Sequence, residues 1–338
     1  MGKNILITTA GGSGIYPFIE AAKTSKYDIN LVLTDASEIA GALYEVEKSY
    51  VVPPVNDKNY LCVLKEIIKK EKIQYFISLL DEELIFLADK DLGVKTLMPS
   101  KEALLNTWDK IKTYQNCPEF FSQTWILNET LNLKEIWKQK PILLKPALSR
   151  GGRGIIIPED FEELEFYAKR FIKKSIPYLI QKFVEGKEYN VSTLHDKEGN
   201  LIYAISRWKF EKRLIKSGSK ASVVEKNEEV INFALQVLKK LGLTYGFNNV
   251  EVIQNEKGIF LLEVNGGRIA AQDMNIVKSG VNFLDIFIDI VDNKKVTPPE
   301  IKEGMCNIKT SRDIWVEFKE IENKKRTLNE YLNSCSSS

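Results

Sequence analysis

Residues 141–154 read Pro-Ile-Leu-Leu-Lys-Pro-Ala-Leu-Ser-Arg-Gly-Gly-Arg-Gly, and this stretch decides the fold of the chain. An apolar run ends at Lys145, a glycine loop follows from Ser149 to Gly154, and a second apolar run covers 155–157. Short apolar runs flanked by proline and glycine are typical of buried strands. Glycines let backbone N–H groups close over phosphate oxygens because they have no Cβ. The stretch therefore predicts a strand, a phosphate-covering loop and a second strand.

The same residues also fit a plain β-hairpin whose wide turn is basic, since Arg150 and Arg153 lie in it. The loop matches neither the P-loop nor the dinucleotide-binding fingerprint. Its role has to be decided by the rest of the chain.

Composition narrows the class of protein. A chain of 338 residues predicts two or three domains, and 44% hydrophobic with 28% charged residues is typical of a soluble globular protein. A net charge of +2 indicates neither nucleic acid nor a membrane as partner. The apolar run near the first residue is too short for a signal peptide, and no later run approaches the roughly 18 residues of a membrane helix. We therefore expect a cytoplasmic protein.

Cysteine and histidine exclude several chemistries. The cysteines at positions 62, 117, 306 and 335 form no CxxC pair and no metal-binding spacing, so we expect reduced thiols. The single histidine, His195, excludes a multi-histidine zinc site within one chain, and a Ser-His-Asp triad would have to use it.

Residues 1–103 alternate between strand and helix patterns. Strands are predicted at 4–9, 29–35, 51–52 and 73–80, and helices at 15–26, at 59–70 and from Asp81 onward. This order predicts a doubly wound parallel α/β domain. Carboxylates at 81–83 suit the first turn of a helix, where the helix dipole favours negative charge.

The first glycine loop, Gly11-Gly12-Ser-Gly14, does not have the G-x-G-x-x-G spacing, because the position three beyond Gly14 is Pro17. A substrate-facing loop or a plain strand-to-helix turn therefore fits better than a nicotinamide site.

The rest of the chain mixes helices with antiparallel hairpins. Helices are predicted over 101–115, 133–139, 160–173, 227–241 and 281–291, and hairpins over 188–205 and 246–264. A basic stretch lies between the hairpins and contains Arg207, Lys209, Lys212, Arg213, Lys216 and Lys220. It fits a solvated loop or a contact with an acidic substrate or a phosphate group. We expect residues 331–338 to form a disordered tail.

Polar residues on the predicted strands complete the pattern. Glu188 follows the segment that starts at Gln181, Glu251 lies on one strand of the last hairpin, and Glu263-Val-Asn265 lies on the other, followed by Arg268. Carboxylate and amide oxygens are the hard ligands that Mg²⁺ takes beside waters and phosphate oxygens.

Taken in order, residues 3–290 resemble the ATP-grasp superfamily, and more narrowly the branch of carboxylate-amine ligases that includes the large subunit of carbamoyl phosphate synthetase. The resemblance rests on the Asp109-Lys110 pair, Lys145-Pro146 with the glycine loop, and the polar residues just described. It implies a two-lobed ATP-grasp fold after the N-terminal α/β domain, with a lid subdomain over 104–178 and a catalytic subdomain with an antiparallel sheet over 179–330.

The resemblance also implies a role for each matching residue. ATP phosphates would be held by Lys110, Lys145, Ser149, Gly151, Gly152, Arg153 and Gly154. Adenine would lie against Gln181, Lys182, Phe183 and Val184, with backbone bonds at Lys182 and Val184, and Glu188 would accept from the ribose hydroxyls. One or two Mg²⁺ ions, or Mn²⁺ in their place, would be bound by Glu251, Glu263 and Asn265. Arg268 would be the catalytic residue that steadies the transferred phosphoryl group.

The implied reaction is an ATP-dependent ligation. A carboxylate becomes an acyl phosphate, and an amine then displaces phosphate to give an amide, with release of ADP and phosphate. Phosphoryl transfer needs cations and a dry site more than covalent help, which suits a chain with one histidine. The implied partners are a small carboxylate and a small amine, and relatives leave a homodimer open.

Three residues depart from the family pattern. Glu251 stands where relatives often have Gln or Asp, Gln181 where many have glutamate, and Asn265-Gly-Gly-Arg268 replaces the usual Asn-Pro-Arg. The last departure leaves a non-catalytic nucleotide-binding protein of the same fold as an alternative. A dinucleotide-dependent oxidoreductase that uses the first glycine loop is a third.

Overall fold

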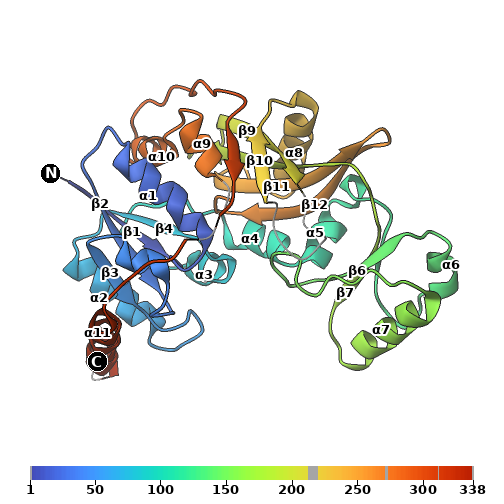
Figure 1. The fold of residues 1–338 in the computed structure, drawn as a ribbon, viewed down its shortest axis with the longest axis horizontal. Coiled ribbons are helices and arrows are strands. Elements are labelled where there is room, and N and C mark those ends of the chain that lie inside the picture. Colours follow the sequence, from blue (N-terminus) through green and yellow to red (C-terminus); the bar gives the residue numbers. More distant parts are fainter. Residues whose placement is uncertain (1, 212–219, 271–272, 311, 337–338) are drawn as a thin grey trace.

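The computed structural model describes residues 2–211, 220–270, 273–310 and 312–336. These residues form three sheets, of four, three and six strands. Figure 1 shows the four-stranded sheet with the chain's N-terminus at one end of the molecule and the three-stranded sheet at the other, with the six-stranded sheet between them. The sheets confirm the predicted fold class: a parallel α/β domain followed by lobes with antiparallel sheets.

The N-terminal sheet is parallel and has the order β3-β2-β1-β4. Its strands are β1 (Lys3–Thr8), β2 (Ile29–Asp35), β3 (Lys48–Val51) and β4 (Tyr75–Ser78), and its helices are α1 (Tyr16–Lys23), α2 (Tyr60–Lys70) and α3 (Asp81–Leu87). Side chains alternate across a strand, so Ile5 and Ile7 join one core cluster while Leu6 joins the cluster that contains α2 residues. Both faces of the sheet are thereby covered.

The first glycine loop, residues 11–14, is held by a hydrogen bond to Asp35 at the end of β2. Asp35 Oδ2 accepts from the Gly11 N–H at 2.6 Å, and Asp35 Oδ1 accepts from the Ser37 N–H at 2.8 Å. The loop leads through a short 3-10 turn, Ser13–Ile15, into α1. Both oxygens of the acidic residue at the end of β2 therefore hold the chain's own backbone, which argues against the dinucleotide reading.

The helix predicted over 101–115 is two helices, α4 (Lys101–Trp108) and α5 (Lys110–Asn116). Asp109 has an extended backbone conformation between them, and its side chain accepts from the Ile111 and Lys112 N–H groups. The aspartate thus ends one helix and caps the next.

The three-stranded sheet is antiparallel and has the order β5-β7-β6. Its strands are β5 (Thr124–Ile126), β6 (Ile142–Pro146) and β7 (Tyr178–Lys182), and α6 (Leu133–Trp137) and α7 (Phe161–Lys173) contribute to its core. The second strand predicted at 155–157 is reduced to one bridge between Leu144 and Ile156. The domain boundary predicted between residues 178 and 179 falls inside β7, whose partners are β5 and β6.

The six-stranded sheet has the order β12-β11-β8-β9-β10-β13. Its strands are β8 (Lys187–His195), β9 (Leu201–Glu211), β10 (Ala221–Val224), β11 (Gly246–Asn255), β12 (Gly258–Gly266) and β13 (Cys306–Ile308). Helix α8 (Glu228–Lys240) packs on one face through residues such as Ala234 and Val237. Strand β9 extends past the end predicted at residue 205, so Arg207 and Lys209 lie in a strand; Lys212, Arg213 and Lys216 lie outside the described residues.

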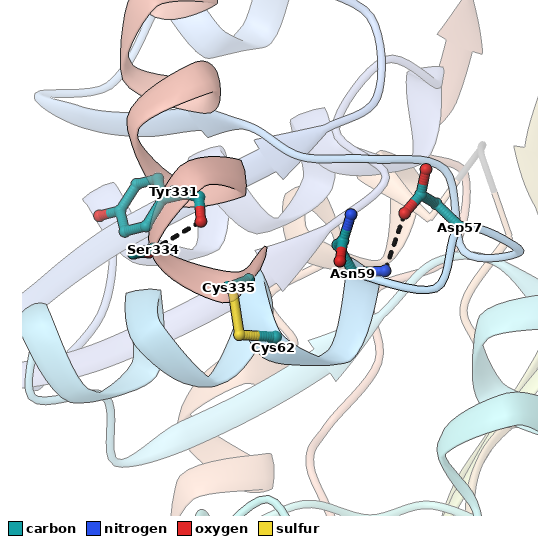
Figure 2. Close-up of a disulfide and its surroundings, with 6 residues drawn as sticks. All are labelled: Asp57, Asn59, Cys62, Tyr331, Ser334 and Cys335. Atoms are coloured by element: carbon teal, nitrogen blue, oxygen red, sulfur yellow. Dashed lines mark hydrogen bonds between the residues drawn. A yellow bond between two sulfur atoms is a disulfide. The ribbon is translucent and has the colours of Figure 1, made fainter. Parts of the chain in front are cut away.

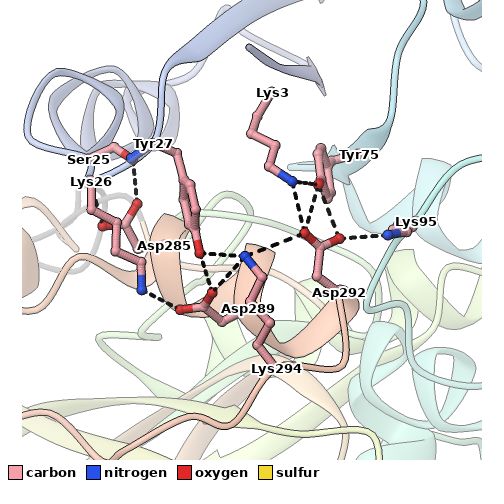
Figure 3. A network of polar contacts seen from close by, with 10 residues as sticks. All are labelled: Lys3, Ser25, Lys26, Tyr27, Tyr75, Lys95, Asp285, Asp289, Asp292 and Lys294. Carbon is pink, nitrogen blue, oxygen red and sulfur yellow. Dashed lines mark hydrogen bonds and ion pairs between the residues drawn. The ribbon is translucent and has the colours of Figure 1, made fainter. Parts of the chain in front are cut away.

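Helices α9 (Met274–Lys278) and α10 (Phe283–Val291) return the chain to the N-terminal domain. The rings of Phe18 in α1 and Phe283 in α10 meet edge to face at 5.0 Å between centroids. Beside them, Asp292 accepts from Lys3, Tyr75 and Lys95, and Asp289 accepts from Lys26 and Tyr27 (Figure 3). This polar network links the end of α10 to β1 and β4.

The chain ends on the N-terminal domain, where α11 (Phe318–Ser336) packs against β3 and α2. Cys335 in α11 and Cys62 in α2 form a disulfide across 273 positions of sequence (Figure 2). Two predictions are therefore wrong. Residues 331–336 are helical instead of a disordered tail, because Tyr331, Leu332 and Cys335 pack on the core under β3. Four reduced thiols were expected, but only Cys117 and Cys306 are free cysteines among the described residues.

The helices within the described residues include none with the length and apolar character needed to cross a membrane.

Candidate active site

One face of the six-stranded sheet gathers charged residues from four strands. Glu251 on β11 lies opposite Glu263 on β12, and Glu188 on β8 lies opposite Lys209 on β9. Directly paired residues point to the same side of a sheet with Cβ atoms about 5 Å apart. The strands therefore bring three carboxylates together that are separated by up to 75 positions in the sequence.

Lys209 bridges two carboxylates of this row. Its Nζ lies 2.6 Å from Glu188 Oε1 and 2.8 Å from Glu251 Oε2. Burial opposes a charge on this lysine, yet the two carboxylates raise its pKa. Desolvation also opposes the charge of the Glu251 carboxyl, but Lys209 lowers the pKa of that carboxyl overall. The sequence alone places Lys209 only in a general basic stretch, because its two partners lie on other strands.

Lys110, the first residue of α5, pairs with Glu263, the third carboxylate of the row. Its Nζ lies 3.2 Å from Glu263 Oε1 and donates to the Ser149 carbonyl at 2.8 Å. The Lys110 N–H also donates to the Ala147 carbonyl at 3.0 Å. The extended residue Asp109 between α4 and α5 thus places the Lys110 side chain between Glu263 of β12 and Ser149 of the glycine loop.

Lys145 ends β6 and reaches the same strand. Its Nζ donates to the Leu262 carbonyl at 2.5 Å, next to Glu263. Burial lowers the pKa of Lys145 to about 8, with Lys110 adding to the fall and Glu263 opposing it. A buried lysine that holds its proton this weakly is suited to a site where an anion arrives.

The glycine loop, Ser149–Gly154, lies over this cluster with three glycines at positive φ: 58° at Gly151, 71° at Gly152 and 78° at Gly154. Residues with a Cβ rarely adopt this conformation. Arg150 pairs with Glu82 at the start of α3 and lies 5.4 Å from the centre of the Trp108 ring. The N-terminal domain therefore holds the loop through its arginine.

The predicted adenine segment follows β7. The Lys182 N–H donates to the Gln123 carbonyl, and the Lys182 carbonyl accepts from Ser122 Oγ at 2.9 Å, which leaves it one lone pair. The Phe183 N–H donates to the Pro141 carbonyl at 2.9 Å. The Val184 N–H has no hydrogen-bond partner among the residues that the structure describes. Gln181 is buried in the centre of the small sheet.

Arg268 lies in the site despite the altered spacing after Asn265. Its Nη2 donates to Asn265 Oδ1 at 2.6 Å, and its Nε lies 2.8 Å from Asp81 Oδ1. Burial opposes the charge, but Asp81 raises the pKa of Arg268 further. Gly267 has φ of 78°, so the Gly-Gly pair makes the turn that brings the arginine back. Sequence reasoning missed Asp81, which belongs to another domain.

Glu251, Glu263 and Asn265 form an oxygen donor set that fits Mg²⁺. Glu251 faces Glu263 across the ladder, and Asn265 stands two residues further on the same face of β12. No group of three or more His, Cys, Asp or Glu that could hold a metal ion occurs among the described residues. The two carboxylates and the amide would therefore share an ion with phosphate oxygens and water, which is the usual habit of Mg²⁺.

Behind this row, Arg207 is fully buried and pairs with the equally buried Asp273 at 2.6 Å between Nη2 and Oδ1. Asp273 Oδ2 accepts from the Ala270 N–H at 3.0 Å. The pair therefore anchors the segment that follows Arg268 onto β9.

The described geometry agrees with a family comparison. A model for the ATP-grasp domain matches residues 105–272, which include every site residue on β6, β8, β11 and β12. Residues 105–272 of this chain form an ATP-grasp domain. A second model, for the PylC-like N-terminal domain, matches residues 5–97.

Known proteins with similar sequences match different shares of this chain. The carbamoyl phosphate synthase large chain of Clostridium botulinum (strain Eklund 17B / Type B) is 33% identical over 133 residues, which are 37% of this chain and 12% of that protein. The tyramine–L-glutamate ligase of Methanocaldococcus fervens is 25% identical over 260 residues, 75% of this chain and 78% of that protein. The match to the synthase thus spans about an eighth of its length.

Among solved structures, the biotin carboxylase domain of the Hydrogenobacter thermophilus 2-oxoglutarate carboxylase, in complex with MgADP, has a TM-score of 0.67. It is 21% identical, and the match covers 90% of this chain and 73% of that one. This similarity shows the shared ATP-grasp fold.

Proposed function

We propose that this protein is an ATP-dependent carboxylate-amine ligase that releases ADP and phosphate. One observation carries the proposal: Lys110, Lys145 and Lys209 meet Glu188, Glu251 and Glu263 on one sheet face below the glycine loop. These are the cations and hard oxygen ligands that phosphoryl transfer needs, inside a domain of the matching family.

The contacts of Lys110 and Lys145 indicate how the phosphates of ATP are bound. Lys110 and Lys145 bind Glu263 and the Leu262 carbonyl, so they are held at the site with their charges directed to β12. A triphosphate carries several negative charges, so it attracts Lys145 more strongly than the neutral Leu262 carbonyl does and Lys110 more strongly than the single Glu263 carboxylate does. The lysines therefore turn to the phosphates as Glu263 is released.

The nucleoside has complementary groups on the chain. The Lys182 carbonyl and the Val184 N–H supply one acceptor and one donor for the adenine edge. Glu188 accepts from the ribose hydroxyls, with Lys209 holding its carboxylate in place. The glycine loop then covers the phosphates with its N–H groups and excludes water.

Glu251, Glu263 and Asn265 would hold one or two Mg²⁺ ions, with Mn²⁺ as a substitute. The metal would neutralise charge on the phosphates, which otherwise repels the attacking carboxylate. Arg268 stands beside this set, bound to Asn265, where its guanidinium stabilises the transferred phosphoryl group and the acyl phosphate. Because Arg268 lies in the site, the spacing of the Asn-Gly-Gly-Arg segment no longer favours a non-catalytic protein.

The proposal is tested by a phosphate-release screen of carboxylic acids against amines with Mg-ATP. We expect phosphate and ADP to appear only when a matching acid and amine are both present, and Glu263→Gln to abolish turnover. Glu256→Gln, an exposed residue in the same hairpin's turn, is the matched control. Formation of AMP and pyrophosphate would refute the proposal, as would full turnover in Glu263→Gln. A cytoplasmic location and a homodimer remain predictions from the sequence.

A further inference from the structure

Strand β13 brings the C-terminal part of the chain to the edge of the catalytic sheet. Asn307 on β13 lies opposite Ser222 on β10, and the Lys309 N–H donates to the Lys220 carbonyl at 2.9 Å. Ser222 Oγ accepts from Asn275 of α9, the helix that follows Asp273. Arg207 lies opposite Val224, two residues from Ser222, so this face of β10 is the one that carries Arg207. Strand alternation places Lys309 on the same face as Asn307.

Lys309 shares its surroundings with two other cationic side chains, those of Lys209 and Arg207. It is partly buried, and burial lowers its pKa, with the nearby charges of Lys209 and Arg207 lowering it further and Glu251 opposing them. Among the described residues, the Lys309 side chain has no hydrogen-bond or ion-pair partner, whereas Lys209 and Arg207 each have carboxylate partners. The corner between β9, β10 and β13 therefore holds one cation in excess.

The sequence that joins β9 to β10 supplies mainly positive charge. Residues 212–219 read Lys-Arg-Leu-Ile-Lys-Ser-Gly-Ser, and the remaining undescribed positions hold Met, Ala, Gln and Ser. Between Arg207 and Lys220 the sequence has six cationic side chains and one acidic one, Glu211. A partly buried charge without a partner is costly, so a bound anion is the natural complement.

Arg207 gives a second, independent sign of a missing ligand. Its Nη2 binds Asp273, Asn190 and Ser192, but its Nε and Nη1 are buried without a hydrogen-bond partner within the described part of the chain. Buried donors are nearly always satisfied in native proteins. Two donor atoms of a fully buried arginine are thus left without a partner among the described residues, on the sheet face that also carries Lys309.

We propose that Lys309, with Lys209 and Arg207, forms a binding site for the carboxylate of the acid substrate at the β9–β10–β13 corner. The proposal rests on the proposed ligase function and deepens it. The phosphates of ATP are met by Lys110 and Lys145 at β12, on the other side of Glu251 from Lys209. Because Lys209 Nζ lies 2.8 Å from Glu251 Oε2, a carboxylate that contacts Lys209 lies beside the proposed metal ligand.

The kinetic test uses Lys309→Met and the control Lys302→Met, an exposed lysine before the same strand. We expect Lys309→Met to raise KM for the acid about tenfold or more, as the loss of one charge-assisted bond does, while KM for ATP stays within about twofold. Lys302→Met should behave like the unaltered protein, and Lys309→Arg should restore part of the affinity. An unchanged KM for the acid, or an equal rise for ATP, would overturn the proposal.

A labelling test does not depend on finding the reaction. Lys309 is acetylated with acetic anhydride and quantified by peptide mass spectrometry, in the presence of succinate, acetate or inorganic phosphate at equal ionic strength. We expect either carboxylate to slow labelling of Lys309 at least threefold and to leave Lys302 unchanged. Protection by phosphate alone would overturn the assignment to a carboxylate, and no protection would overturn the site. Protection without product in any acid-amine screen would instead refute the ligase function alone.

Discussion

Arg268 Nε lies 2.8 Å from Asp81 Oδ1, and this ion pair joins the catalytic sheet to the N-terminal parallel domain. Asp81 is the first residue of α3, and only two residues separate it from the carboxyl end of β4. The next residue, Glu82, pairs with Arg150 of the glycine loop. The first turn of α3 therefore holds both the proposed catalytic arginine and the loop that covers the phosphates.

Asp81→Asn should lower kcat more than it changes KM for ATP. The asparagine can still accept a hydrogen bond from Arg268, but it has no negative charge to hold the guanidinium in position. The guanidinium is then less well oriented toward the phosphoryl group. We expect kcat to fall about tenfold or more, as when an oriented ionic contact is lost. Steady-state kinetics beside Asp89→Asn, whose exposed pair with Lys101 contributes little, provides the comparison. Equal losses in both variants would show that Asp81 has no special role.

The sequence was sufficient for residues whose chemistry stands out locally. Glu263 and Asn265 interrupt an apolar strand, and Lys145 ends one beside a glycine loop, so each signals a ligand on its own. Asp81 and Lys209 carry no such signal, because a carboxylate in a first helical turn and a lysine in a basic stretch are ordinary. Their roles come from partners 187 positions away for Asp81 and 42 for one partner of Lys209. Only tertiary structure supplies such pairs.

The same reason explains the errors at the C-terminus. A serine-rich end is typical of a disordered tail, and nothing local to Cys335 indicates a partner at Cys62. The helix forms because α11 covers β3, an edge strand of the parallel sheet, and edge strands are commonly protected in this way.

Lys209→Met should make the protein depend on Mg²⁺ for stability. The substitution leaves Glu188 and Glu251 facing each other without a cation, which we expect to lower the free energy of unfolding by about 1–3 kcal/mol. Mg²⁺ can replace the lysine charge at Glu251, so adding it should raise the melting temperature more in Lys209→Met than in the unaltered protein. Thermal melts with and without Mg²⁺ measure this. Lys187→Met, which lies on β8 but outside the carboxylate row, should show no extra Mg²⁺ effect; an identical Mg²⁺ shift in all three proteins would contradict the charge replacement.

Glu82→Gln should loosen the glycine loop with little effect on overall stability. The Glu82–Arg150 pair is largely exposed, and such pairs contribute about 0–1 kcal/mol, so the melting temperature should hardly change. Local opening is expected to increase, because few other contacts hold the loop. Trypsin should therefore cleave after Arg150 or Arg153 faster in Glu82→Gln, and Mg-ADP should slow cleavage in both proteins. Glu135→Gln, from another exposed pair, controls for general effects; if Mg-ADP fails to protect the unaltered loop, the loop does not cover phosphates.

Nucleotide affinity should fall as the pH rises above about 8. The folded protein holds Lys145 at a pKa of about 8, below its ordinary 10.5, so between these values the unfolded chain carries the extra proton and this group adds stability as pH rises. Bound phosphates instead favour the protonated form of Lys145. Nucleotide binding above pH 8 must therefore be accompanied by uptake of a proton by this lysine. Calorimetric titration of Mg-ADP at pH 8.5 in two buffers of different ionisation enthalpy measures the uptake. Lys145→Met should bind weakly and without it; the same uptake in this variant would assign the proton to another group.

Reduction of the Cys62–Cys335 disulfide should release α11 before the rest of the protein unfolds. The helix is polar, and it touches the core mainly through Leu328, Tyr331 and Leu332. The bond closes a loop of 273 positions, a length for which removal of a disulfide costs on the order of 2–5 kcal/mol when the whole loop is freed. Cys335→Ser should therefore expose amides 318–336 to rapid hydrogen exchange while β1 and β2 stay protected. Cys306→Ser, which removes an exposed free thiol, is the matched control. Slow exchange in α11 of Cys335→Ser would show that packing alone holds the helix.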